Sequence, residues 1–242
     1  MKVAIITGSS NGIGRQIALE FAKDNYNIII NYNKSKTQAF NLAEQIKRLG
    51  RNCITVQADV SKLCEAQNLI DKSLNAFGKI DILVNNAGIS LQKIFQDVSE
   101  DEWKNLFAVN LGSVFNCCSC VLNDMLLRKK GKIINISSIW GMVGASMEVH
   151  YSASKAAIIG LTKALAKELG PSGINVNCIA PGVIDTNMNS FDNEIISKLK
   201  NDTPLGRIGT TLDVAKTALF LASDDSDFIT GQVISPNGGF VI

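Results

Sequence analysis

A tyrosine and a lysine four residues apart, Tyr151 and Lys155, form the pair in this sequence that is suited to proton transfer. On a helix, two such residues lie on one face, a turn from each other. A phenol has an unperturbed pKa of about 10 and is a poor proton shuttle at neutral pH. A neighbouring ammonium group stabilises the phenolate, and a useful lowering of the pKa demands a close, partly buried cation. The spacing therefore predicts that Lys155 lowers the pKa of Tyr151.

A serine stands upstream of this pair, where it can assist the same chemistry. Ser138 follows an apolar run at residues 133–136. At the carboxyl end of a strand, its hydroxyl could steady a substrate oxygen by hydrogen bonding. A Tyr-x-x-x-Lys spacing also arises by chance on an ordinary helix surface. The functional interpretation is favoured because the serine and the pair follow the glycine turn described next.

A glycine-rich turn follows the first apolar run, where residues 7–14 read TGSSNGIG. Glycines permit positive φ angles and let backbone amides approach a ligand closely. The helix that follows offers free N–H groups and the positive end of its dipole, which suit a pyrophosphate. The spacing differs from the common Gly-x-Gly-x-x-Gly fingerprint, and the missing Lys-Ser/Thr excludes a P-loop. The motif predicts a dinucleotide site or, alternatively, a purely structural turn.

The second apolar run ends in residues 31–35, NYNKS, which include no acidic residue. In a dinucleotide-binding fold this segment lies near the adenine ribose, where a carboxylate would bind the ribose hydroxyls and repel a 2′-phosphate. A cation and polar donors without a carboxylate favour NADP over NAD. The alternative is that Lys34 and Lys36 belong to a solvated loop.

Short apolar runs alternate with longer amphipathic stretches along the whole chain. The expected strands are residues 3–6, 28–30, 54–56, 80–84, 133–136, 176–179 and 232–234. The expected helices are residues 13–23, 37–49, 63–77, 102–128, 151–169 and 212–221. Continuous β-branched runs suit strands buried on both faces of a parallel sheet. The alternation predicts one α/β domain over residues 1–242, a Rossmann-type doubly wound parallel sheet of about seven strands with helices on both faces.

Length and composition narrow the possible partners. The chain has 242 residues, 46% of them hydrophobic, and a net charge of +2. That balance excludes a nucleic-acid binder that relies on bulk positive charge. No uninterrupted apolar run approaches the roughly 18 residues of a membrane helix. The N-terminal apolar run is too short for a signal peptide, and the six cysteines lack the spacing of a secreted disulfide framework. We therefore expect a cytoplasmic protein with no membrane or nucleic-acid partner.

Taken together, these motifs make the chain similar to the short-chain dehydrogenases/reductases over essentially its whole length. The residues that match the cofactor-binding motifs of that family are Gly8, Ser10, Asn11, Gly12, Ile13, Gly14, Asn33, Asp59, Val60, Asn86, Ala87, Gly88, Tyr151, Lys155, Pro181, Gly182, Ile184 and Thr186. The residues that match its catalytic set are Asn110, Ser138, Tyr151 and Lys155.

The resemblance implies hydride transfer between the C4 atom of NADP(H) and a carbonyl or alcohol carbon, without a metal. In the reductive direction it implies that Tyr151 donates the proton and that Ser138 positions the carbonyl oxygen. It implies that Lys155 lowers the pKa of the tyrosine and holds the nicotinamide ribose. Asn110 would support Lys155 through an ordered water, or alternatively would only bend its helix.

Within the family, the Asn31-Tyr32 pair and the tail at residues 229–239 resemble the 3-oxoacyl-acyl-carrier-protein reductases. That resemblance implies an NADPH-dependent homotetramer that reduces a 3-oxoacyl thioester in fatty acid synthesis, with acyl carrier protein as the partner that delivers the substrate. Asn11 stands where those enzymes commonly have arginine. Lys129 and Ser172 stand where they often carry arginines near the mouth of the site, so docking of the carrier protein is left open.

A second group within the family competes. Residues 137–141, SSIWG, with residues 144–149, GASMEV, resemble reductases of a 5-aminopentanone modification on elongation factor P. In that case Trp140 could line a pocket for a linear chain or act as a structural plug. A non-catalytic NADP-binding regulator is a third hypothesis, although such a protein is expected to lack the Tyr151 or Lys155 side chain.

Two further features bear on the substrate. His150, the one histidine of the sequence, precedes Tyr151, and contact with the substrate is one hypothesis for it. The polar segment 185–207 is expected to form a mobile lid that orders when the cofactor binds.

Overall fold

The described residues form one parallel sheet of seven strands in the order β3-β2-β1-β4-β5-β6-β7. They come from a computed structural model that describes residues 1–186 and 193–242. The strands are β1 Val3–Ile6, β2 Asn27–Tyr32, β3 Cys53–Gln57, β4 Ile82–Asn85, β5 Gly131–Ile136, β6 Ile174–Ile179 and β7 Val233–Ile234. The order reverses between β1 and β4, and in such sheets a crevice opens at the carboxyl ends of the strands there. The predicted Rossmann-type α/β fold is confirmed.

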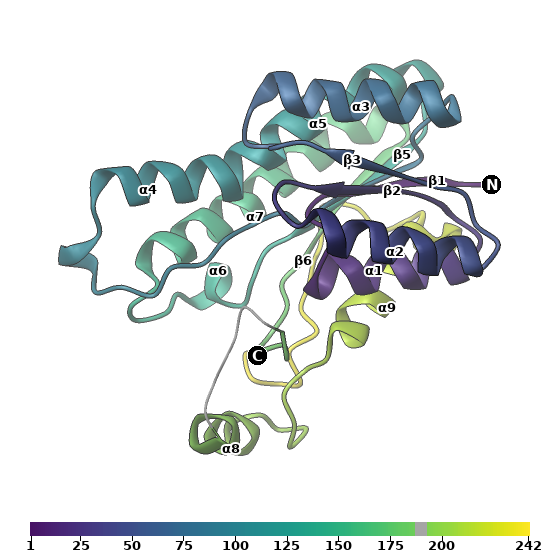
Figure 1. The fold of residues 1–242 in the computed structure, drawn as a ribbon. Coiled ribbons are helices and arrows are strands. Elements are labelled where there is room, and N and C mark those ends of the chain that lie inside the picture. The colour runs from purple at the N-terminus through teal and green to yellow at the C-terminus, as the bar shows by residue number, and fades with distance from the viewer. Residues whose placement is uncertain (187–192) are drawn as a thin grey trace.

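Helices cover both faces of the sheet (Figure 1). One face carries α1 Gly12–Lys23, α2 Lys36–Arg48 and α9 Thr211–Ala222; the other carries α3 Leu63–Phe77, α5 Ser113–Arg128 and α7 Val149–Leu169. Along β1, Ala4 and Ile6 pack into the first core, whereas Val3 and Ile5 pack into the second. Both faces of β1 are therefore buried, which is why its sequence is continuously apolar.

The helix expected at residues 102–128 is interrupted. It divides into α4 Glu100–Phe107 and α5, joined by a π-helical turn at Ala108–Gly112. Ser99 and Glu102 form a capping box that starts the first segment. A π-helical turn accommodates an extra residue and is frequent at functional sites. Asn110 lies in that turn, so its backbone departs from the straight helix that the apolar periodicity predicts.

Two helices were not anticipated from the sequence. The short α6 Trp140–Val143 follows β5, and α8 Asn193–Asp202 lies away from the sheet (Figure 1). The second belongs to the segment 185–207 that was expected to form a lid. Residues 187–192 of that segment lie outside the described residues, so the expectation of a mobile lid is untested there.

One helical segment within the described residues, Glu100–Arg128, is long and apolar enough by length and composition to cross a membrane, with a mean hydropathy of 1.5. The segment is not an uninterrupted apolar run, because polar residues such as Asn110 and Asn116 divide it, so the expectation about uninterrupted runs is not contradicted. The window is half buried inside the protein, and its α5 part packs against α3 and β4. Core helices pass the same test, so composition alone is weak evidence for a membrane span.

Candidate active site

A cleft of about 1430 Å³ lies where the carboxyl ends of the strands meet. Typical small-molecule pockets are about 300–1,000 Å³, so this cleft can hold a dinucleotide together with a second ligand. The predicted site residues that line it are Gly8, Ser10, Asn11, Gly12, Ile13, Asn33, Asp59, Val60, Asn86, Ala87, Gly88, Ser138, Tyr151, Lys155, Pro181, Gly182, Ile184 and Thr186. Gly14 and Asn110 lie behind its wall.

The glycine turn is fastened to the end of β4. The hydroxyl of Thr7 accepts hydrogen bonds from the backbone N–H groups of Asn86, at 2.9 Å, and Ala87, at 3.0 Å. The amide of Asn86 donates to the carbonyl of Thr7 at 2.9 Å. Gly8 has a φ of +61°, and a Cβ there would lie 3.1 Å from the Cα of Ala87. Glycine is needed at this position because both the backbone angle and the close approach disfavour a side chain.

Gly14 has a packing role and lies outside the predicted cofactor surface. A Cβ at this position would lie 2.4 Å from Nδ2 of Asn86 and 2.9 Å from the carbonyl oxygen of Gly8. The missing side chain therefore lets α1 pack onto the β4 end of the turn. Gly14 is not among the residues that line the cleft, and its predicted contact with the cofactor stays a prediction.

Asn31 has a positioning role that the sequence analysis missed. Its Oδ1 accepts from the N–H of Gly8 at 3.1 Å, and its Nδ2 donates to the carbonyl of Ala58 at 3.1 Å. The side chain is 1% exposed and thus ties together the segments that follow β1 and β3. A polar residue inside an apolar strand was the available signal, since buried amides need partners.

The turn and the start of α1 suit an anionic group. Gly12 has a φ of +55°, and the side chain of Asn11, the N-cap residue, makes no capping hydrogen bond within the described structure. The first N–H groups of α1 are thus not capped by that side chain, and the helix dipole favours an anion there. The Cγ2 atom of Thr186 lies 3.9 Å from the Cβ position of Gly12, so the segment after β6 approaches the turn. These features fit the diphosphate of a nicotinamide dinucleotide.

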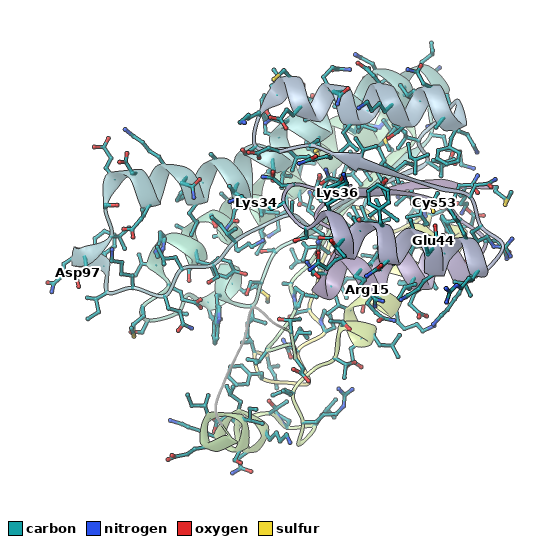
Figure 2. The ribbon with its side chains drawn as sticks, in the orientation of Figure 1. Arg15, Lys34, Lys36, Glu44, Cys53 and Asp97 are labelled. Atoms are coloured by element: carbon teal, nitrogen blue, oxygen red, sulfur yellow. The ribbon has the colours of Figure 1, made fainter. Side chains whose placement is uncertain are left out.

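The end of β2 presents polar and cationic groups to the cleft. Asn33, Lys34, Ser35 and Gln38 line it there. Lys34 and Lys36 lie at the start of the α2 region, whereas Arg15 lies on the side of α1 that faces α2 (Figure 2), where it donates to Gln45 at 2.7 Å. Asp59 also lines the cleft, and its Oδ1 accepts from the hydroxyl of Ser61 at 2.7 Å.

The short helix α6 brings Ser138 to the start of α7. A Cβ at Gly141 would lie 2.7 Å from the carbonyl carbon of Lys155, so only glycine lets the two helices approach this closely. Ser137 donates to the carbonyl of Lys155 at 2.8 Å, which secures the same contact. The hydroxyl of Ser138 interacts with that of Tyr151 and favours its ionised form.

Lys155 and Tyr151 lie on one face of α7, as their spacing predicts. The ammonium group of Lys155 is 5.6 Å from the centroid of the Tyr151 ring. It donates to the carbonyl of Ile136 at 3.0 Å, and the residue is 4% exposed.

The expected lowering of the pKa of Tyr151 is wrong for the cofactor-free protein. Burial, with a smaller contribution from the Glu148 carboxylate, raises the pKa of Tyr151 to about 12. Burial likewise lowers the pKa of Lys155 to about 8. Desolvation of both groups thus outweighs the help that the pair was expected to give.

Asn110 connects the π-helical turn to the catalytic helix. Its Oδ1 accepts from the N–H of Ile89 at 2.8 Å, and its Nδ2 donates to the Ser154 hydroxyl at 3.0 Å. A Cβ at Gly88 would lie 3.2 Å from Oδ1 of Asn110 and 3.4 Å from Nζ of Lys155. The turn therefore places a fully buried amide close to Lys155. Support of Lys155 through an ordered water stays a prediction, and so does the alternative that Asn110 only bends its helix.

Two other predicted features lie elsewhere. His150 is buried, does not line the cleft, and has no hydrogen-bond partner for either ring nitrogen among the described residues. Lys129 was expected near the mouth of the site. It instead lines a second cavity of about 980 Å³ with residues such as Gly131 and Ile174, at the amino ends of β5 and β6. Ser172 lies next to Gly173, whose Cβ position is 2.5 Å from the carbonyl oxygen of Lys129. The expectation fails for this chain because its active-site cleft opens at the opposite edge of the sheet.

Comparisons with known proteins agree with this geometry. Residues 8–241 match the family described as Enoyl-(Acyl carrier protein) reductase. The chain is 43% identical over 239 residues to 3-oxoacyl-(acyl-carrier-protein) reductase FabG of Staphylococcus epidermidis, covering 98% of each chain. It is 42% identical to the enzyme of that name from Staphylococcus aureus, covering 98% of this chain and 97% of the relative. With the one from Chlamydia trachomatis it shares 45% identity over 245 residues, covering 98% and 96%. The chain therefore belongs to the short-chain dehydrogenase/reductase family, whose members are oxidoreductases acting on C=O or CH–OH groups.

Proposed function

We propose that this protein is an NADPH-dependent reductase that converts a 3-oxoacyl thioester, carried on acyl carrier protein, to the 3-hydroxyacyl form in fatty acid synthesis. The observation that carries the chemistry is that Ser138, Tyr151 and Lys155 line one cleft with a glycine turn. The substrate is proposed from the relatives named above, which are 3-oxoacyl-(acyl-carrier-protein) reductases.

The proposed mechanism uses the protonated phenol of Tyr151. When bound, the cofactor supplies the hydride that the carbonyl carbon accepts. Ser138 orients the carbonyl oxygen, and Tyr151 gives its proton to that oxygen as negative charge develops. A pKa of about 12 does not prevent this step, because an alkoxide is about as basic as hydroxide, whose conjugate acid has a pKa of about 15.7. At a pH below its pKa of about 8, Lys155 is cationic. Its positive charge stabilises the phenolate that Tyr151 becomes after it has given up its proton.

The residues that line the cleft indicate where each part of the cofactor would bind. The glycine turn and the start of α1 would hold the diphosphate, and Asp59 with Val60 would contact the adenine. Asn33 and Lys34 would receive the 2′-phosphate, which we propose as the reason for a preference for NADPH. Turnover with NADPH and NADH at equal concentrations tests this preference, and faster turnover with NADH would contradict it.

The setting of the enzyme is also a proposal. We place it in the cytoplasm as a homotetramer, with a carrier protein delivering the carbonyl substrate. The carrier protein is proposed from the names of the relatives, and the assembly from the exposed apolar side chains of α4 and α5.

A second candidate is reduction of the 5-aminopentanone group on elongation factor P. It is favoured by Trp140, which lines the cleft and contacts Phe240 edge-on with ring centroids 6.0 Å apart, and by Glu148, which also lines it. The two candidates share the reaction and differ in the protein that carries the carbonyl group. Turnover of a 3-oxoacyl carrier protein and of the modified elongation factor, measured side by side, distinguishes them.

Replacement of Tyr151 by phenylalanine tests the reductase chemistry itself. Removal of the proton donor is expected to lower kcat about 100-fold or more while NADPH binding persists. Tyr32→Phe is a matched control, because Tyr32 is buried at the end of β2 and does not line the cleft. NADPH binding by the wild type without turnover of either carrier-bound substrate would favour the non-catalytic regulator instead.

A further inference from the structure

One acidic side chain stands in the part of the cleft that faces away from the glycine turn. This part, the substrate side, is lined by Ile89, Ser90, Gln92, Trp140, Gly144, Ala145, Ser146, Glu148, Ile195 and Leu199. Glu148 is the acidic residue that lines this part. Its carboxylate is close enough to Tyr151 to disfavour ionisation of the phenol.

Glu148 differs from the other buried acids of the described chain. Three acidic residues are 9% exposed or less: Glu20, Asp81 and Glu148. Glu20 pairs with Lys23 at 2.7 Å and Lys216 at 2.8 Å. Asp81 pairs with Lys79 at 2.9 Å and Arg128 at 3.3 Å. Glu148 has no lysine or arginine within ion-pair distance among the described residues. Its Oε1 instead accepts one hydrogen bond, from the Ser90 hydroxyl at 2.8 Å.

The usual structural role of an acid at this position is also absent. Glu148 is the N-cap residue of α7, yet within the described structure its side chain makes no capping hydrogen bond. Its carboxylate therefore neither caps the helix nor pairs with a cation of the chain. Burial of a carboxylate is unfavourable unless it is paired or fully hydrogen-bonded, and one hydroxyl satisfies only part of its acceptor capacity. A cationic group in the cleft would supply the missing partner.

We propose that Glu148, held by Ser90, is a specificity-determining residue that binds an ammonium group on the carbonyl substrate. The proposal rests on the reductase chemistry proposed above and deepens its second candidate, whose 5-aminopentanone group carries an amine, by naming the residue that would bind that amine. An ammonium group at Glu148 would also offset the negative charge next to Tyr151, so that binding of the substrate would assist proton donation by the phenol.

A matched pair of ketones tests the proposal. One is an aliphatic methyl ketone with a terminal primary ammonium group, and the other carries a hydroxyl in its place; several spacer lengths are compared. With NADPH, the wild-type enzyme is expected to reduce the best ammonium ketone with a kcat/KM about tenfold or more above that of its hydroxyl partner, as a charge-assisted hydrogen bond would give. Glu148→Gln is expected to abolish this ratio, because it lowers kcat/KM for the ammonium ketone about tenfold more than for the hydroxyl ketone.

Two further variants secure the interpretation. Ser90→Ala removes the hydroxyl that holds Glu148 and is expected to reduce the ratio without abolishing it. Glu100→Gln changes an exposed acid on α4 outside the cleft and is expected to leave the ratio unchanged. A wild-type ratio near one, or a ratio that persists in Glu148→Gln, overturns the proposal. If neither ketone nor a 3-oxoacyl thioester is reduced, the proposed function itself fails.

Discussion

At the scale of single residues, burial decides the protonation of the catalytic pair. The sequence pattern places Lys155 one helical turn after Tyr151, and general chemistry then predicts a more acidic phenol. In the folded chain the hydroxyl of Tyr151 and the ammonium of Lys155 both lose water, which favours the neutral form of each. A neutral phenol is the form that a reductase needs before proton donation. Sequence could identify the pair, whereas the sign of the shift depends on solvent exposure, which only the fold determines.

Lys155 should therefore make stability depend on pH in the cofactor-free protein. Its pKa falls from 10.5 to about 8 on folding, so between these values the unfolded chain binds more protons and stability rises with pH. Between about pH 7 and about pH 9.5 the rise amounts to about 2 kcal/mol, at about 1.4 kcal/mol per pKa unit. Urea denaturation of the wild type and of Lys155→Met, at about pH 7 and about pH 9.5, measures it as a difference. If the free energy of unfolding of the wild type does not rise relative to that of Lys155→Met over this range, the lowered pKa of Lys155 is contradicted. Above pH 10 the raised pKa of Tyr151 works in the opposite direction, so the comparison stops below that value.

At the scale of elements, the site depends on close contacts between segments far apart in sequence. Apolar β-branched runs predicted all seven strands of the sheet, because burial on both faces leaves a continuous signal. The π-helical turn at Ala108–Gly112 and the helix α6 gave no such signal. In the π-helical turn, Asn110 is hydrogen-bonded to Ile89. In α6, Gly141 packs closely against α7. Both are tertiary contacts, which local sequence does not predict. Local sequence patterns therefore predicted the strands around the site. They did not predict the π-helical turn and α6, which position its side chains.

Gly14 offers a test of one such contact. Alanine is a better helix former by about 1 kcal/mol, but its Cβ would lie 2.4 Å from Nδ2 of Asn86. That amide already donates to Thr7 and Gly8 and cannot move freely. We expect Gly14→Ala to lose about 1–3 kcal/mol of stability and to weaken NADPH binding about tenfold or more.

Gly170→Ala is the matched control for this prediction. Gly170 has a φ of −53° and open space at its Cβ position, so alanine should be neutral or stabilise by up to about 1 kcal/mol. Thermal melts and titration with NADPH measure both variants. Equal behaviour of the two would show that the contact between α1 and Asn86 does not position the turn.

At the scale of the whole molecule, the segment Glu100–Arg128 presents an apolar surface that the chain leaves exposed. Phe115 is 59% exposed and Leu127 is 86% exposed on α5, and Trp103 is 37% exposed on α4. The neighbouring α7 exposes the small residues Ala156, Gly160 and Ala164 at a spacing of four, which lets another helix approach closely. Exposed apolar patches mark interaction sites. We therefore predict that this surface is buried between subunits, which would account for the apolar composition of the segment.

We predict that the protein assembles into a tetramer through this surface. Sedimentation velocity of the wild type is expected to show a tetramer, and Phe115→Glu is expected to dissociate it into smaller species, because a charge at a subunit contact loses its water without gaining a partner. Leu49→Glu is the matched control, since Leu49 is 41% exposed at the end of α2, on the other face of the sheet. A monomeric wild type, or a Phe115→Glu variant that sediments as the wild type does, contradicts the role of this surface. If the variant dissociates and also loses activity, then the α4 and α5 contact supports the π-helical turn, and through Asn110 the catalytic helix that it touches.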